Sequence, residues 1–200
     1  MSIEVGGKLR ITSIDANTGK ILDVDEGSNL VLKSGSVGLA NLITGLTVLP
    51  VGERIAAEGQ VIRDFIGPVP DIVKFVQFGT RSTPVTYNDI SPWENGTLDA
   101  NSVSPNPANA SPIVEISKDN IGLGTDGTIQ FTCILDSSKG NSLSGNVTYT
   151  EAVLMGLAQV SPFVKYKWFA RRVFPGKIKN SSIALKADWF LYFYVKEAIS

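Results

Sequence analysis

The sequence predicts a mainly β protein, an antiparallel sandwich or jelly-roll-like body with one or two short helices and a long irregular loop. Short segments rich in β-branched and aromatic residues recur in the second half of the chain, with Gly-, Asn- and Ser-rich turns between them. The 19 glycines and 10 prolines also suit a turn-rich fold, and only 18% of residues are charged. Short predicted strands at regular intervals, with turns between them, are typical of sandwiches and barrels. With 43% hydrophobic residues, the chain can bury one core, so we expect residues 1–200 to form a single β-rich domain.

Residues 1–33 are predicted to form an N-terminal hairpin region. Residues 8–15 and 20–25 resemble strands, and the first of these alternates polar with apolar side chains. The Ala-Asn-Thr-Gly run at 16–19 predicts the turn between them. Residues 27–29, Gly-Ser-Asn, predict another turn before a short apolar run at 30–32.

Residues 34–70 resemble a short helical insertion. An apolar stripe over residues 34–45, with Ser before it and Gly at its end, predicts one short helix. A second helix is predicted over residues 51–65. Three prolines, Pro50, Pro68 and Pro70, bracket this second segment.

A strong strand pattern at residues 71–78 is followed by a long irregular stretch at 79–112, which holds five prolines and many Ser, Thr and Asn residues. Loops of this length are uncommon inside compact domains and often mediate contact. We interpret it as an extended arm over a neighbouring subunit, with plain surface looping as the alternative.

Strands are then predicted at 113–117, 127–135, 146–157, 163–174 and 182–195, with a proline turn between the last two. The final strand carries five aromatic residues and is apolar on both faces, which favours a central strand or an interface strand.

Several function classes lose a required residue. The chain has no histidine, which removes the commonest general base and metal ligand. Its single cysteine, Cys133, excludes an intrachain disulfide, and we expect it to be a small buried hydrophobe. The glycines at 122–127 match a dinucleotide motif, but a strand pattern follows where a helix is needed, so they are read as turn glycines. We therefore predict no enzyme, no cofactor and no metal.

No stretch is apolar enough for a transmembrane helix and the N-terminus lacks a signal-peptide pattern. We therefore expect the protein to stay in a cytosol-like compartment and not to insert in a membrane.

Charge is divided unevenly along the chain. Residues 1–151 carry 10 basic and 17 acidic side chains, net −7, whereas residues 152–200 carry 8 basic and 2 acidic ones, net +6. One interpretation is nucleic-acid or membrane binding by the basic end. The favoured one is complementarity between neighbouring subunits, or between the two ends of one subunit.

The basic stretch at 165–179 mixes cations with aromatics, as in single-stranded nucleic-acid binders, but edge-strand cations explain it more simply. Three tryptophans, Trp93, Trp168 and Trp189, could be sugar platforms, although tryptophans in β segments more often belong to the core. The candidate interface residues are Lys165, Lys167, Arg171, Arg172, Lys177, Lys179 and Trp93.

Parts of the sequence resemble tailed-bacteriophage virion proteins. The run Glu-Ala-Val-Leu-Met-Gly-Leu at 151–157 resembles their E-A-G-L-F strand, although Val153 replaces the usual glycine. Residues 169–193 resemble their ending, in which A-R and F-P precede K-x-S and a tryptophan. Residues 76–86 resemble their F-G-T-G-x-T-x-P turn, and the opening hairpin with residues 29–45 resembles their N-terminal part. The segments at 48–70 and 93–112 depart from this pattern.

The resemblance implies a virion component without carrying over any catalytic residue. We expect a structural subunit of the tail, baseplate or neck, assembled in the host cytoplasm as a homo-oligomeric ring with other virion proteins, since ring interfaces need two complementary patches. The alternatives are a capsid decoration or head-fibre protein, a carbohydrate-binding receptor module, and a nucleic-acid-binding module, the last not expected.

Overall fold

The computed structural model describes residues 2–32, 35, 54–55, 61–63, 73, 75–80, 82–86, 113–142, 145–160 and 163–196. Within these residues the mainly β prediction is confirmed. Nine strands follow one another in a sheet of order β3-β4-β9-β10-β2-β1-β11-β8-β7, while β5 pairs with β9 and β6 pairs with β5. The strands are β1 Ser2–Asp15, β2 Ile21–Val31, β3 Arg54–Ile55, β4 Val61–Arg63, β5 Phe75–Gly79, β6 Ile113–Glu115, β7 Ile121–Leu123, β8 Ile129–Leu135, β9 Val147–Val160, β10 Phe163–Lys179 and β11 Ile183–Lys196, with the short 3-10 helix η3 at Lys118–Asn120.

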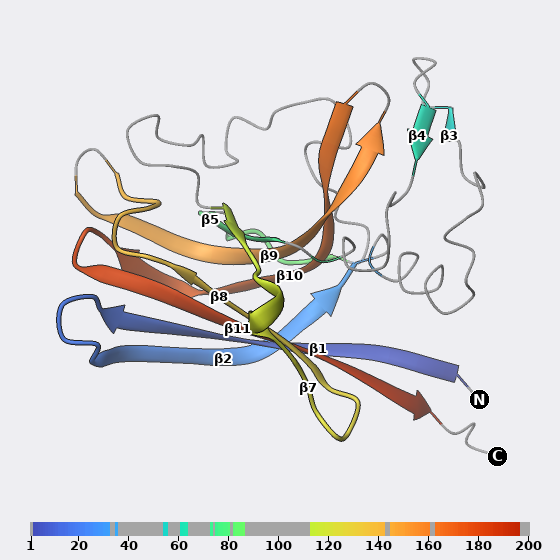
Figure 1. Ribbon diagram of the computed structural model, residues 1–200, viewed down its shortest axis with the longest axis horizontal. Helices are drawn as coiled ribbons and strands as arrows, with labels where there is room; N and C mark the ends of the chain where they lie inside the picture. The colour runs from blue at the N-terminus through green and yellow to red at the C-terminus, as the bar shows by residue number, and fades with distance from the viewer. Residues whose placement is uncertain are drawn as a thin grey trace.

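The sheet curls so that two layers face each other, and β2 belongs to both (Figure 1). Most of β2 pairs with β1, whereas its last residues, Leu30 and Val31, pair with β10. The layer of β1, β11 and β8 and the layer of β5, β9 and β10 enclose one apolar core. Its largest members include Trp189, Phe78, Phe169, Tyr149, Leu9 and Leu154. The predicted sandwich thus takes the form of one continuous antiparallel sheet.

The N-terminal hairpin is confirmed, but the turn predicted at residues 27–29 is wrong. β1 and β2 meet at a turn in which Asp15 Oδ1 accepts hydrogen bonds from the backbone N–H groups of Asn17 and Thr18. β2 then runs on without interruption, and Gly27 lies opposite Leu9 of β1. A Cβ on Gly27 would lie 2.6 Å from Nη2 of Arg172, so this glycine serves close packing rather than a turn.

The predicted proline turn near residue 175 is also wrong. β10 continues through Pro175 and Gly176 to Lys179, and its register with β9 shifts between Val173 and Lys177. Because proline has no N–H to donate to the ladder, it is accommodated where the pairing is interrupted. The chain reverses instead at residues 180–182, before β11.

Within the segment predicted as a helix at 51–65, the described residues are strands. β3 and β4 pair with each other, and β4 pairs with the end of β9. The β-branched residues Ile55, Val61 and Ile62 suit this pairing. The helix predicted at 34–45 lies outside the described residues except for Gly35, and so does most of the arm predicted at 79–112. No helix in the described part of the chain is long and apolar enough to span a membrane.

Candidate interface surface

Four of the candidate interface residues are buried in the fold. Arg171, Arg172, Lys177 and Lys179, all on β10, are 1%, 8%, 5% and 0% exposed. Lys165 and Lys167 also lie on β10, but their side chains are outside the described part, as is Trp93 altogether. The structure therefore does not present these four cations to a neighbouring chain.

Two of the buried cations connect β10 to acidic residues on the inner face of β2. Arg172 Nη2 lies 2.5 Å from Asp25 Oδ2, and Nη1 donates a hydrogen bond of 2.8 Å to the Leu9 carbonyl oxygen. Lys177 pairs with Asp23, and this hydrogen bond lowers the pKa of the Asp23 carboxyl. These contacts stabilise the junction at which β2 passes from one layer to the other.

Arg171 points to the opposite face of β10, where it pairs with Glu151 of β9 at 2.7 Å. Both side chains are buried, and Arg171 Nη2 also donates to the carbonyl oxygen of Thr83 at 3.2 Å. A small apolar cluster occupies the same face of β9 and β10 and consists of Leu32, Val153, Met155 and Trp168, with Phe75, Val85 and Ile113 against it. The pair therefore helps to fix residues 82–86 over the sheet.

Lys179 is enclosed at the end of β10 by oxygen atoms. Its Nζ donates hydrogen bonds to Asn141 Oδ1 at 2.6 Å and to the carbonyl oxygens of Asn180 at 3.0 Å and Ser137 at 3.4 Å. Burial lowers the pKa of this amine to about 8, against a smaller opposing effect of the Asp136 carboxylate.

These contacts show that charges of opposite sign from the two parts of the sequence pair within one chain. The basic C-terminal segment contains the partners of acidic residues in β2 and β9, in line with the alternative of complementarity within one subunit. The four cations at 171, 172, 177 and 179 are buried, so they cannot contact the phosphates of a nucleic acid. Strand alternation could not have predicted this burial, because Arg171 and Arg172 are adjacent on β10 and both are buried, and the sequence does not reveal which acids lie opposite them.

The tryptophans and the cysteine also lie inside. Trp168 is 4% exposed and Trp189 0%, so the interpretation as sugar platforms is wrong for these two. Cys133 is buried in the core as predicted, and burial raises the pKa of its thiol to about 12. Among the described residues no three His, Cys, Asp or Glu side chains gather into a metal site.

Among the described residues, one surface that remains available is formed by the solvent-facing side chains of β8, β11, β1 and β2, and we call it the outer face. Side chains directly opposite in antiparallel strands share a face, so the pairings define rows across it. The rows are Gln130–Phe190–Lys8–Ser28, Thr132–Asp188–Arg10–Glu26, Ile134–Lys186–Thr12–Val24 and, nearest the β1–β2 turn, Ala184–Ile14–Ile21.

The first two rows are joined by polar contacts. Glu26 accepts from Lys8 at 2.5 Å and from Arg10 at 2.7 Å, which lowers the pKa of its carboxyl. Asp188 accepts from Thr132 at 2.7 Å and pairs with Lys186 at 3.0 Å. The Arg10 guanidinium also lies 5.9 Å from the centre of the Phe190 ring.

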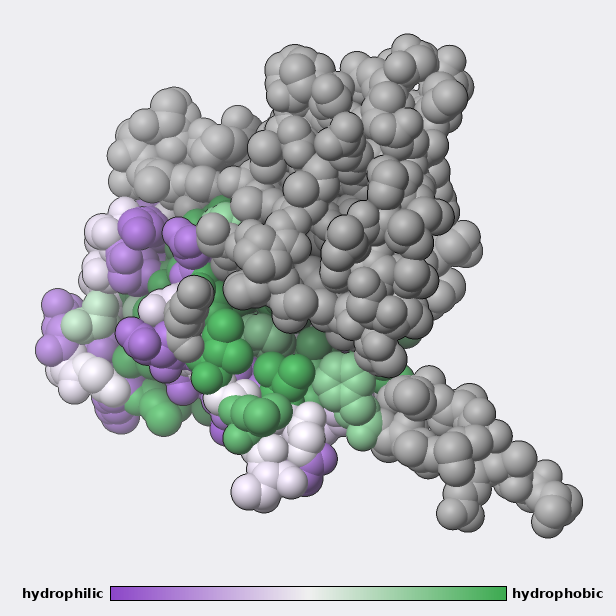
Figure 2. All heavy atoms as spheres, turned by 45° about the vertical axis from the view of Figure 1, so that its right-hand side comes forward, coloured by the Kyte–Doolittle hydropathy of each residue, from purple (hydrophilic) through white to green (hydrophobic). Residues whose placement is uncertain are grey.

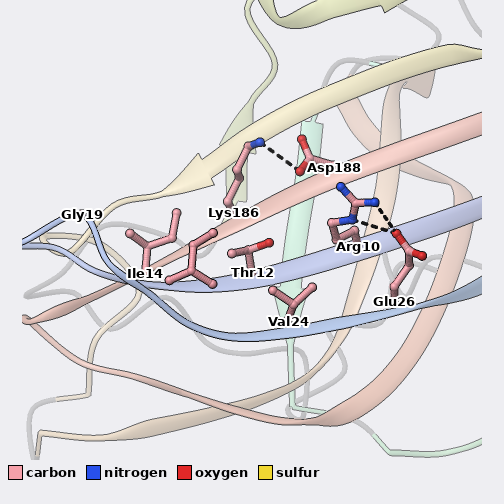
Figure 3. A pocket seen from close by; sticks show the side chains of 9 residues that line it. Arg10, Thr12, Ile14, Gly19, Val24, Glu26, Lys186 and Asp188 are labelled. Atoms are coloured by element: carbon pink, nitrogen blue, oxygen red, sulfur yellow. Dashed lines mark hydrogen bonds and ion pairs between the residues drawn. The ribbon is translucent and has the colours of Figure 1, made fainter.

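A hollow of about 670 Å³ lies across the last three rows, and its apolar side chains come from the last two of them. Ile14, Ile21 and Val24 line it, with Gly19 of the hairpin turn at one end and Arg10, Glu26, Lys186 and Asp188 at the other (Figure 3). Ile21 is 59% exposed and Val24 49%, and Ile134 in the neighbouring strand is 49% exposed. Water-exposed aliphatic side chains around a concavity favour occupation by another apolar group.

A second apolar feature lies at the edge strand β7, where Ile121 is 41% exposed and Leu123 78%. The β7–β8 hairpin projects from the body, with hydrophobic side chains beside its polar tip (Figure 2). Its turn is fixed by a hydrogen bond of 2.7 Å from Gly124 N to the Thr128 carbonyl oxygen and by Gly127 at a φ of 80°. Natural edge strands usually carry charges that discourage association, and β7 carries none.

Comparison with known proteins adds no relative: no family model, curated protein or solved structure matches this chain. The candidate site therefore stands on its own geometry, which consists of an apolar hollow, an apolar projection and a set of cations used within the chain.

Proposed function

We propose that this chain is a structural subunit of a tailed-bacteriophage virion, in the tail, baseplate or neck, and that it assembles with other copies and other virion proteins. The observation that carries an assembly role is the exposure of large aliphatic side chains on the outer face and on β7 of a well-packed β body. Such patches on soluble proteins mark contact sites. The placement in a virion rests on the sequence motifs at 76–86, 151–157 and 169–193.

The chemistry of the described residues supports a contact role rather than a reaction. The buried ionisable groups on β10 have intrachain partners, and the thiol of Cys133 lies inside the core with a raised pKa. A nucleophile needs a low pKa and access to substrate, and Cys133 has neither.

Nucleic-acid binding is the weaker candidate, because phosphate contacts require exposed cations. Arg171, Arg172, Lys177 and Lys179 are buried, and on the outer face Lys8, Arg10 and Lys186 each lie beside a carboxylate.

The test is quantitative mass spectrometry of purified phage particles that derive from the genome encoding this chain. The proposal predicts the chain at a fixed copy number per particle, comparable to that of other structural proteins and retained after a high-salt wash. Its absence from particles, or a copy number that falls to background after the wash, would contradict the proposal.

A further inference from the structure

The hollow and the hairpin form a matched pair of features on one chain. The hollow is apolar at Ile14, Ile21 and Val24, and the hairpin presents Ile121 and Leu123. At about 670 Å³, the open hollow has room for the aliphatic side chains of a short strand.

The hairpin cannot reach the hollow of its own chain. Ile121 lies opposite Phe131 and Leu123 opposite Ile129, so the turn at 124–128 extends beyond the end of β8 that is farthest from Ile134. Ile134 is in the same row as Val24, which lines the hollow. It lies five residues from Ile129, and this separation corresponds to about 16 Å along the strand. The hydrogen-bonded turn and the pairing with β8 prevent the hairpin from folding back.

The two features also open on opposite faces of the sheet. Ile121 and Leu123 lie on the same face as Phe131 and Ile129, which pack toward the core, whereas the hollow opens on the outer face. A contact between them therefore joins two copies head to tail, which is a heterologous interface and leads to a ring or an open filament.

The charges around the hollow and on the hairpin also favour a second copy of this chain as the partner. On the rim of the hollow the cations are more exposed than their partners: Lys186 is 35% exposed against 4% for Asp188, and Arg10 is 44% exposed against 31% for Glu26. The turn of the hairpin carries an exposed carboxylate at Asp126. The amide of Thr128 donates to Asp126, which lowers the pKa of that carboxyl and keeps it ionised at neutral pH.

We propose that the hollow of the outer face binds the β7–β8 hairpin of a second copy of this chain, with Leu123 inserted beside Ile14, Ile21 and Val24. This inference rests on the proposed assembly role and specifies its interface. The contact is directional, since each copy offers one hairpin and one hollow. Repetition of the contact adds further copies until the ring closes.

The test uses Leu123→Asp, which places a charge on the hairpin, and Val24→Asp, which places one in the hollow. Ile178→Asp is the matched control, because Ile178 is 52% exposed on β10, in the other layer. Circular dichroism and thermal melting establish that each variant is folded. Light scattering then gives the mass of each variant alone and of an equimolar mixture of the first two.

We expect the wild type and Ile178→Asp to form oligomers and each of the other variants alone to have the 21.4 kDa mass of a monomer. Their mixture should form a dimer of twice that mass, because the intact hollow of one variant accepts the intact hairpin of the other. Two results overturn the inference: a mixture that stays monomeric, and an oligomer lost in only one of the two variants. Loss with Leu123→Asp alone indicates symmetric pairing of β7 edges, and loss with Val24→Asp alone indicates another occupant of the hollow.

This outcome is distinguishable from that of the particle analysis. If the chain is present in particles but its self-association does not depend on Val24, only the proposed interface is overturned. A chain that forms the mixed dimer but is absent from particles overturns only the virion assignment.

Discussion

At the scale of single residues, the stability of this fold depends on buried cations. From the sequence alone, these cations would be assigned to the surface. Arg171 and Glu151 are the clearest case, because both side chains are almost fully buried. The attraction between such charges roughly offsets the cost of removing them from water, whereas one charge left alone is strongly unfavourable.

Arg171→Met should therefore lower the free energy of unfolding by about 3–5 kcal/mol, measured by urea denaturation, because Glu151 loses its buried counter-ion. Lys139→Met is the control, since Lys139 and Asp136 form an exposed pair 3.8 Å apart, and a change below about 1 kcal/mol is expected there. Equal effects of the two substitutions would show that Arg171 is not buried as described.

Lys179 predicts a dependence of stability on pH. Its folded pKa of about 8 lies below the unfolded value of 10.5, so between these values the unfolded chain binds more protons and stability rises with pH. The stability that comes from neutral Lys179 is fully present above about pH 10.5 and is lost as the pH falls through about 8.

The difference in unfolding free energy between the wild type and Lys179→Met should therefore shift in favour of the wild type between pH 8 and 10. Taking this difference cancels the opposite effects of Cys133 and Tyr149, whose folded pKa values are raised to about 12. A difference that is constant over this range would contradict the account.

At the scale of elements, local patterns predicted the strands well where local causes determine them. The β1–β2 hairpin follows from the turn residues between the strands. Gly124 and Gly127 lie at the β7–β8 turn as predicted, but Gly122, also predicted as a turn glycine, lies in β7, a strand that the sequence did not predict. Errors arose where the cause lies far away in the sequence. Gly27 resembled a turn glycine, yet it makes room for Arg172, and no local signal reveals a partner 145 residues away.

Gly27→Ala tests this explanation. The added methyl group would displace the Arg172 guanidinium from Asp25, and we expect unfolding in urea to require about 1–3 kcal/mol less free energy. Gly122→Ala serves as the matched control in another strand, because its Cβ would meet only Gln130 Cβ at an ordinary 3.8 Å. If both glycines tolerate alanine equally, close packing is not the reason for Gly27.

The candidate site was predicted less well than the strands. Its sequence prediction relied on the density of cations in 165–179, but four of these cations are buried against partners within the chain. The acids at 151, 25 and 23 pair with three of them, and Asn141 accepts a hydrogen bond from the fourth, Lys179. The hollow combines residues from β1, β2 and β11, which meet only after the sheet has formed. Its apolar members have no distinctive spacing in the sequence, so no pattern could have selected them.

At the scale of the whole molecule, the buried ion pairs and the exposed apolar groups have separate roles. Buried ion pairs join β10 to β2 and β9, whereas exposed aliphatic side chains on the outer face and on β7 remain available for other chains. If association relies on these apolar groups, it should persist when salt screens the charges around them.

The most direct test of the assembly role is the mass of the purified wild-type protein, measured by light scattering over a range of concentrations at low and high salt. We predict a mass that is a multiple of 21.4 kDa, increases with concentration to a limit and persists at about 1 M salt, at which the screening length is about 3 Å. A 21.4 kDa monomer at every concentration, or an oligomer that dissociates at high salt, would contradict assembly through these apolar surfaces.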